Sequence, residues 1–320
     1  MTALDADDVA RAAADAEADQ TLDTPRSSPT RQPRGGRLAE SGTVRRRGVQ
    51  IAGYRLEEMI GEGGAATVFR ATRDGRAYAV KLFRWPMERT DLRWRRFERE
   101  LRVGMTLRHP ALVRVHDWAL YRERPFLVMD LLEGRTLKRR LEQEGPLDLV
   151  AARGVLAPLV EALDLAHAQG IVHRDVKPEN VFLTDGDATP RLLDFGLVSF
   201  LVEEGGTLEG QALGTPRYMP PEQLIDSRGV GPWSDQYALA ATAYEMLTGQ
   251  PPHVATNLIG LLLAKQEPPW VPQSLPPSWR AALRRALDPD PENRFGSVAS
   301  FLDAATAGQG PFPADAPERA

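Results

Sequence analysis

The stretch of sequence that decides the fold is His173-Arg174-Asp175-Val176-Lys177-Pro178-Glu179-Asn180. It follows an apolar run with helical spacing and precedes an apolar, strand-like run over residues 181–183. One short loop thus supplies a carboxylate on Asp175, a cation on Lys177 and an amide oxygen on Asn180. These groups can accept a proton, neutralise charge and ligate a metal ion. A merely solvated polar loop rarely contains them in this order, so we interpret the loop as catalytic.

A second carboxylate follows on the C-terminal side of this loop. Asp194 lies nineteen residues after Asp175 and begins the tripeptide Asp194-Phe195-Gly196, directly behind the apolar pair Leu192-Leu193. A carboxylate at the end of a buried strand suits a hard cation such as Mg²⁺. Taken alone, the tripeptide is frequent and usually forms a turn.

On the N-terminal side, a glycine-rich segment over residues 60–68 lies between two predicted strands. Glycines let backbone N–H groups close over phosphate oxygens, although such a segment alone could be an ordinary hairpin. Lys81 ends the next apolar strand, where burying its charge unpaired is costly. It therefore needs an anion such as a phosphate, unless it lies on an edge strand and faces water.

Together, the glycine-rich segment, Lys81, the loop around Asp175 and the Asp194 tripeptide resemble, in this order, the protein kinase family. Lys177, two residues after Asp175, makes the loop similar to that of Ser/Thr kinases, and the overall style resembles the bacterial eukaryotic-like Ser/Thr protein kinases. The resemblance covers residues 51–305. It implies an α+β, bilobal protein kinase fold. A small antiparallel-sheet N-lobe with one main helix (about 51–129) would precede a larger, mainly helical C-lobe (about 130–305).

The resemblance also implies an ATP site. Lys81 would hold the α- and β-phosphates and pair with Glu100, for which Glu98 is a rival. Met129 would be the gatekeeper, and residues 130–132 the hinge that binds adenine through its backbone. The implied ATP-binding residues are Ile60, Gly61, Glu62, Gly63, Gly64, Val68, Ala79, Lys81, Met129, Asp130 and Leu132.

For the chemical step, the resemblance implies that Asp175 accepts the proton of the substrate hydroxyl and that Lys177 steadies the transferring phosphoryl group. Asn180 and Asp194 would hold Mg²⁺, which Mn²⁺ could replace. The implied catalytic residues are Asp175, Lys177, Lys81 and Glu100. None of the departures from the family pattern, such as Ala66 at the third glycine, removes one of these groups.

Further residues have supporting roles by the same resemblance. In the activation segment, Thr207 is the candidate for a phosphate received by Arg174, and Thr215 would contact Asp175 and Lys177. The remaining assignments concern packing and anchoring. Asp235 would brace the catalytic loop, Glu222 and Arg294 would pair to anchor the activation segment, and His173 would pack under Phe195.

Composition excludes several classes of protein. The 320 residues contain no cysteine, which removes disulfides and Cys-ligated zinc, and the net charge of −4 gives no global basic field for nucleic acid. We find no apolar run long enough to span a membrane and expect a cytoplasmic location. Residues 1–50 form, by composition, a disordered charged tail, and 306–320 a short C-terminal tail.

We therefore expect an ATP- and Mg²⁺-dependent Ser/Thr protein kinase that acts on protein hydroxyls, with self-association for autophosphorylation. A nucleotide-binding pseudokinase or signalling scaffold is the alternative. A small-molecule kinase of related fold would lack the activation segment between Gly214 and Glu222.

One local expectation concerns Pro158, which lies inside the helical run over 149–169 and predicts a kink or an early break there.

Overall fold

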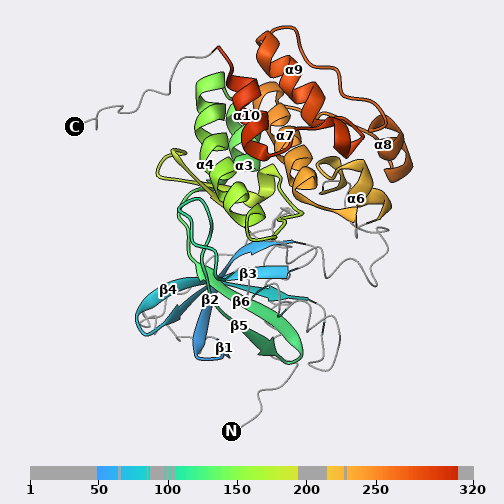
Figure 1. The fold of residues 1–320 in the computed structure, drawn as a ribbon. Helices are drawn as coiled ribbons and strands as arrows, with labels where there is room; N and C mark the ends of the chain where they lie inside the picture. Colours follow the sequence, from blue (N-terminus) through green and yellow to red (C-terminus); the bar gives the residue numbers. More distant parts are fainter. Residues whose placement is uncertain are drawn as a thin grey trace, which may run out of the picture.

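The structure is a computed structural model that describes residues 49–63, 66–84, 86, 98, 101, 105–193, 215–226 and 229–308. The chain forms a strand-rich part and a helical part, which lie at opposite ends of the molecule (Figure 1). We call them the sheet lobe (β1–β6) and the helical lobe (β7 onward). This arrangement confirms the predicted bilobal α+β architecture.

The sheet lobe is one antiparallel sheet with the strand order β1-β2-β3-β4-β6-β5. An Asp74-Gly75 turn joins β3 to β4, and both residues have positive φ, as this hairpin turn requires. The strands are β1 (Gln50–Ile51), β2 (Tyr54–Glu62), β3 (Ala66–Arg73), β4 (Arg76–Phe83), β5 (Val115–Tyr121) and β6 (Arg124–Asp130).

Side chains alternate across this sheet, so each face has its own apolar cluster. One face carries Ala66, Ala79, Phe83, Leu127 and Met129, packed with Leu101. The opposite face carries Ile51, Tyr54, Leu56, Ala71, Val80, Leu82, Phe126 and Val128. We call these the inner face and the outer face.

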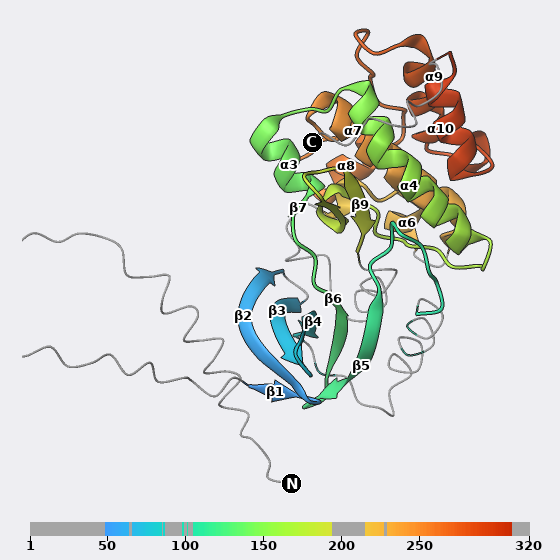
Figure 2. The ribbon, with the colours of Figure 1, turned by 90° about the vertical axis from the view of Figure 1, so that its left-hand side faces the viewer.

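The helical lobe is built around α7 (Pro232–Thr248), in which every residue from Ser234 to Met246 is buried. It surrounds this helix with longer and shorter helices and carries a small sheet of order β7-β8-β9 on the side toward the sheet lobe (Figure 2). The remaining described elements of this lobe are α3 (Leu137–Glu144), α4 (Leu149–His167), α6 (Pro221–Ile225), α8 (Leu258–Ala264), α9 (Pro277–Ala286), α10 (Val298–Thr306), β7 (Arg135–Thr136), β8 (Val181–Thr184) and β9 (Thr189–Leu192), with 3₁₀ turns at Pro178–Asn180, Thr215–Arg217 and Pro291–Asn293.

The expected early break at Pro158 is wrong, because α4 continues from Leu149 to His167. A proline inside a helix costs about 3 kcal/mol. The same helix buries Leu156, Leu159 and Leu163 completely, and each such side chain contributes about 1.5–3 kcal/mol. Core packing on both sides of Pro158 therefore outweighs the lost backbone hydrogen bond. Whether the helix is kinked stays a prediction.

The two lobes are joined by backbone hydrogen bonds as well as by the chain itself. Leu192 of β9 donates its N–H to the carbonyl of Ala111 (2.7 Å) and accepts from the N–H of Val113 (3.1 Å). Leu107, Ala111 and Leu112, which precede β5, belong to the core of the helical lobe. The segment that leads into β5 is thus fixed to the strand that precedes Asp194.

Gly134, between β6 and β7, is expected to tolerate no side chain. Its φ is +143°, and a Cβ atom there would lie 2.0 Å from the carbonyl oxygen of Leu183. We expect Gly134→Ala to lower the free energy of unfolding by about 2–3 kcal/mol, because both the backbone strain and the clash must be relieved. Urea denaturation measures this. Gly296→Ala, where the added Cβ meets nothing within 4 Å, is the control. Equal effects of the two substitutions would contradict the prediction.

Candidate active site

Asp175 is held from two sides within its own loop. Its Oδ1 accepts a hydrogen bond from Lys177 Nζ (2.8 Å), and its Oδ2 accepts one from Asn180 Nδ2 (2.8 Å). Asn180 Nδ2 also donates to the backbone carbonyl of Asp175 (2.8 Å). Two of the polar groups that the sequence places in one loop, on Lys177 and Asn180, therefore converge on the third, the carboxylate of Asp175.

The loop is fixed to the centre of the helical lobe by Asp235, in the first turn of α7. Asp235 is fully buried, and its two oxygens accept from the backbone N–H groups of His173 and Arg174, both at 2.7 Å. His167 Nε2 lies 2.8 Å from Oδ2. Arg174 has φ +68°, a conformation that is costly for a side chain with a Cβ. Asp235 therefore stabilises the strained residue directly before Asp175.

His173 has a structural role in the same network. Its Nδ1 accepts from the N–H of Asp175 (3.2 Å), so its other ring nitrogen, Nε2, is the donor to the carbonyl of Leu193 (2.9 Å). Leu193 also donates its N–H to the carbonyl of Asn180 (2.8 Å). The backbone directly before Asp194 is thus fixed to the metal-ligand candidate Asn180. Asp194 itself lies outside the described residues.

We expect Asp235→Asn to destabilise the protein, because an amide offers one acceptor oxygen where the two backbone N–H groups each need one. One buried donor then faces an NH₂ group. The free energy of unfolding should fall by about 2 kcal/mol. Urea denaturation measures the loss against Asp303→Asn, an exposed carboxylate of α10 that should change it by less than about 0.5 kcal/mol. A loss no larger than that of the control would contradict this bracing role.

Lys81 lies on the inner face of the sheet. In the register, Val68 and Leu127 are its direct neighbours on the adjacent strands, and Ala79 pairs with Met129. Residues opposite one another across antiparallel strands point to the same face. Val68, Ala79, Lys81 and Met129 therefore line one surface. Lys81 is only 8% exposed, so an ammonium group is placed on an otherwise apolar wall.

The glycine-rich segment closes beside this surface. Gly61 is the cross-strand neighbour of Val68, and the N–H of Gly63 donates to the carbonyl of Ala66 (2.9 Å), which closes the turn between β2 and β3. Glu62 pairs with Arg84 at the end of β4. Ile60 is about half exposed. Gly64 lies outside the described residues.

The hinge residues follow β6. The N–H of Asp130 donates to the carbonyl of Arg114 (3.1 Å), and its carboxylate lies 2.6 Å from His116 Nε2. Leu131 packs against the inner-face cluster, and Leu132 is half-buried. The pairing of Asp130 with His116 could not be predicted from the sequence, because no local pattern connects two residues on different strands.

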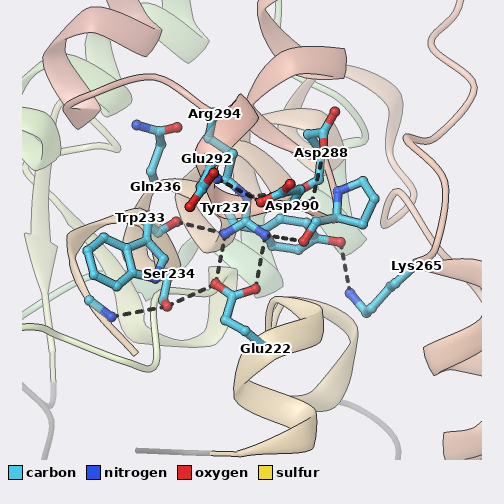
Figure 3. A network of polar contacts seen from close by, with 12 residues as sticks. Glu222, Trp233, Ser234, Gln236, Tyr237, Lys265, Asp288, Asp290, Glu292 and Arg294 are labelled. Carbon is cyan, nitrogen blue, oxygen red and sulfur yellow. Dashed lines mark hydrogen bonds and ion pairs between the residues drawn. The ribbon is translucent and has the colours of Figure 1, made fainter. Parts of the chain in front are cut away.

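Glu222 and Arg294 form a bidentate ion pair (Figure 3). Arg294 NH1 and NH2 donate to the two carboxylate oxygens of Glu222 at 2.8 and 2.9 Å. Arg294 Nε donates to the carbonyl of Asp288 (2.8 Å), and Ser234 Oγ donates to Glu222 (3.1 Å). The neighbouring Gln223 donates to the carbonyl of Arg174 (2.9 Å). The start of α6 is thus fixed to the C-terminal helices and to the catalytic loop.

A buried lysine that the sequence analysis missed lies beside this network. Lys265 Nζ donates to the carbonyl of Arg217 (2.8 Å) and to Tyr237 Oη (3.3 Å). Burial lowers the pKa of Lys265 from 10.5 to about 7. The only sequence signal would have been a lysine at the end of an apolar helix, which normally indicates a solvated position.

Stability should depend on pH through Lys265. Above pH 7 the folded lysine loses its proton while the unfolded chain keeps it up to about pH 10.5, so the free energy of unfolding rises across this window. Below pH 7 the folded protein buries the charged form of Lys265, so the full destabilising effect of that charge is present. We expect this rise to be absent from Lys265→Met. Urea denaturation of both proteins at pH 7, 8 and 9 measures the difference, and parallel profiles would contradict it.

Several residues named from the sequence lie outside the described part of the chain. They are Gly64, Glu100, Asp194, Phe195 and Thr207, and of Thr215 only the backbone is described. Glu98, the rival of Glu100, is half-buried. Within the described residues, no helix is long and apolar enough to cross a membrane.

Comparison with known proteins gives the same family from sequence and from structure. Residues 54–305 match the model of the protein kinase domain. The chain is 33% identical to the serine/threonine-protein kinases PknH and PknA of Mycobacterium tuberculosis, over 81% of its length in each case. It spans 42% of that PknH and 62% of that PknA.

Among solved structures, the kinase domain of M. tuberculosis PknI is similar, with a TM-score of 0.65 and 28% identity. The match covers 82% of this chain and 97% of that domain. Both comparisons agree with the resemblance carried by the motifs, and family members use ATP and a divalent metal ion. The chain therefore belongs to the protein kinase family.

Proposed function

We propose that this protein is a Ser/Thr protein kinase that transfers the γ-phosphoryl group of ATP to protein hydroxyls. The observation that carries the proposal is the environment of Asp175. Its carboxylate is oriented by Lys177 and Asn180 and is fixed through Arg174 to the buried Asp235. A pseudokinase has no need of a lysine and an asparagine that both orient the Asp175 carboxylate. We therefore prefer the active enzyme to the pseudokinase.

The donor set at Asn180 fits a divalent cation. Asn180 Nδ2 makes two hydrogen bonds to Asp175, so the remaining polar atom of the side chain is the carbonyl oxygen Oδ1. Hard cations prefer such oxygen ligands. We assign Asn180 and Asp194 as the ligands of Mg²⁺, for which Mn²⁺ could substitute. The ion would neutralise charge on the phosphates of the bound nucleotide.

The residues of this chain then have different roles in binding the nucleotide and in the transfer step. Lys81, with Glu100 as its proposed partner, holds the nucleotide phosphates from the sheet lobe, while Val68, Ala79 and Met129 form the apolar wall for adenine. Asp175 orients the substrate hydroxyl and accepts its proton. Lys177, 2.8 Å from Asp175, supplies positive charge beside the transferring group. Because the phosphoryl group carries spread negative charge, positioning and electrostatics account for most of the catalysis.

The proposed partners are proteins with an accessible Ser or Thr, among them a second copy of this chain during autophosphorylation. We assign Thr207 as the phosphorylated residue of the activation segment, Arg174 as its receiver, and Thr215 as a contact of Asp175 and Lys177. The anchoring of Glu222 by Arg294 would hold the C-terminal end of this segment.

The experiment is incubation of the full chain with γ-labelled ATP and a generic basic protein, with Mg²⁺, with Mn²⁺ or with EDTA. We expect label on serine and threonine, none on tyrosine, and no transfer in EDTA. Autophosphorylation followed by mass spectrometry should identify Thr207. Nucleotide binding without any transfer would overturn the proposal in favour of the pseudokinase.

A further inference from the structure

A cavity lies at the hinge, on the side of the sheet that Tyr78 and Asp130 face. It has a volume of about 490 Å³, which is in the range of small-molecule sites. Its described lining residues include Arg76, Arg114 and Arg191, the rings of Tyr78 and His116, and Leu131. The cavity therefore combines three arginines with aromatic and aliphatic side chains.

This cavity shares the hinge residues Asp130 and Leu132 with the proposed nucleotide site but opens on the other side of the sheet. Tyr78 and Asp130 are cross-strand partners, and each lies one residue away from the partners Ala79 and Met129. Because side chains alternate along a strand, Tyr78 and Asp130 face the opposite side of the sheet from Ala79, Lys81 and Met129. A molecule in this cavity would contact the hinge from outside, whereas adenine is proposed to contact it from the inner face.

The charges that line the cavity favour the binding of an anion. Asp130 is the one carboxylate among its described lining residues, and that group is already engaged by His116 at 2.6 Å. Arg191 Nε is buried and has no hydrogen-bond partner, which is costly for a guanidinium donor. Arg76 and Arg114 line the same cavity and add two further guanidinium side chains to its border. Guanidinium groups bind phosphates through paired N–H donors.

We propose that this cavity binds a small molecule that carries a diphosphate group. Three arginines exceed what one monophosphate needs. The rings of Tyr78 and His116, whose centroids lie 5.4 Å apart, offer a surface for the organic part of the ligand. Arg76 belongs to β4 of the sheet lobe and Arg191 to β9 of the helical lobe. The ligand would therefore contact both lobes across the hinge. This inference does not rest on phosphoryl transfer.

The test is calorimetric titration of the full chain with pyrophosphate in metal-free buffer. A saturating non-hydrolysable ATP analogue, whose own binding is measured first, occupies the nucleotide site. We expect one pyrophosphate site in the wild-type protein and binding at least about tenfold weaker in Arg114→Ala/Arg191→Ala. The matched control, Arg139→Ala/Arg284→Ala, removes two exposed arginines elsewhere in the helical lobe and should bind like the wild type.

Three outcomes would overturn the proposal. They are no pyrophosphate binding to the wild type, equal affinity in the cavity variant, and equal weakening in the control variant, which would indicate a general effect of charge. Arg76→Glu, an exposed position at the start of β4, serves as a second variant and should weaken binding without affecting folding. Pyrophosphate binding is measured without phosphoryl transfer. A negative result in this titration is therefore distinguishable from a failure of the proposed kinase function.

Discussion

Asp175→Asn should lower the rate of phosphoryl transfer by about 10³-fold, since a positioned general base contributes about 10²–10⁴-fold. The amide is nearly the same size as the carboxylate but cannot accept a proton. It also places an NH₂ group against either Lys177 or Asn180, both of which now donate to Asp175. The measurement is transfer of label from ATP to the protein substrate, together with the affinity for nucleotide.

Nucleotide affinity should be nearly unchanged in Asp175→Asn, because the residue is assigned to the substrate hydroxyl and not to the adenine or the phosphates. The thermal unfolding midpoint checks that the fold is intact, and Asp303→Asn controls for the loss of one carboxylate. Transfer within tenfold of the wild-type rate would contradict the role assigned to Asp175. Loss of both transfer and nucleotide binding would indicate damage to the fold instead.

The motifs of the catalytic loop and the strands around Lys81 could be predicted because their information is local. Residues 173–180 carry their chemistry within eight positions, and the Asp74-Gly75 turn specifies its hairpin. The apolar alternation of the sequence begins at Val113, whereas β5 spans Val115–Tyr121. Val113 instead bonds to Leu192 of the other lobe, a tertiary contact that no strand pattern contains.

Elements with little apolar surface were harder to predict. Helix α3 reads LKRRLEQE and buries only Leu137 and Leu141, so its amphipathic stripe is too short to stand out from a charged loop. Contacts between distant residues were visible only where the family resemblance supplied them, as for Asp235 and the pair of Glu222 with Arg294. The burial of Lys265 and the pairing of His116 with Asp130 were found only in the structure.

Arg294→Met should lower the free energy of unfolding by about 3–5 kcal/mol, the loss expected when one partner of a buried ion pair is removed. The Arg294 side chain is 0% exposed and that of Glu222 is 16% exposed, so Glu222 would keep a largely buried charge that still accepts a hydrogen bond from Ser234. The carbonyls of Asp288, Pro289 and Trp233 would lose their donors as well. Guanidinium denaturation of the full chain measures the loss.

Two further variants separate the ion pair from simple packing. Arg294→Met combined with Glu222→Leu should recover most of the lost stability, because replacing both charges by apolar groups leaves no buried charge unpaired. Arg294→Lys should recover only part, since a single ammonium cannot reproduce the two parallel bonds to Glu222 or the bond from Nε to Asp288. Arg284→Met on the exposed face of α9 is the control. If the double variant is no more stable than Arg294→Met, the guanidinium acts through its carbonyl contacts and its packing on Tyr237, and not through Glu222.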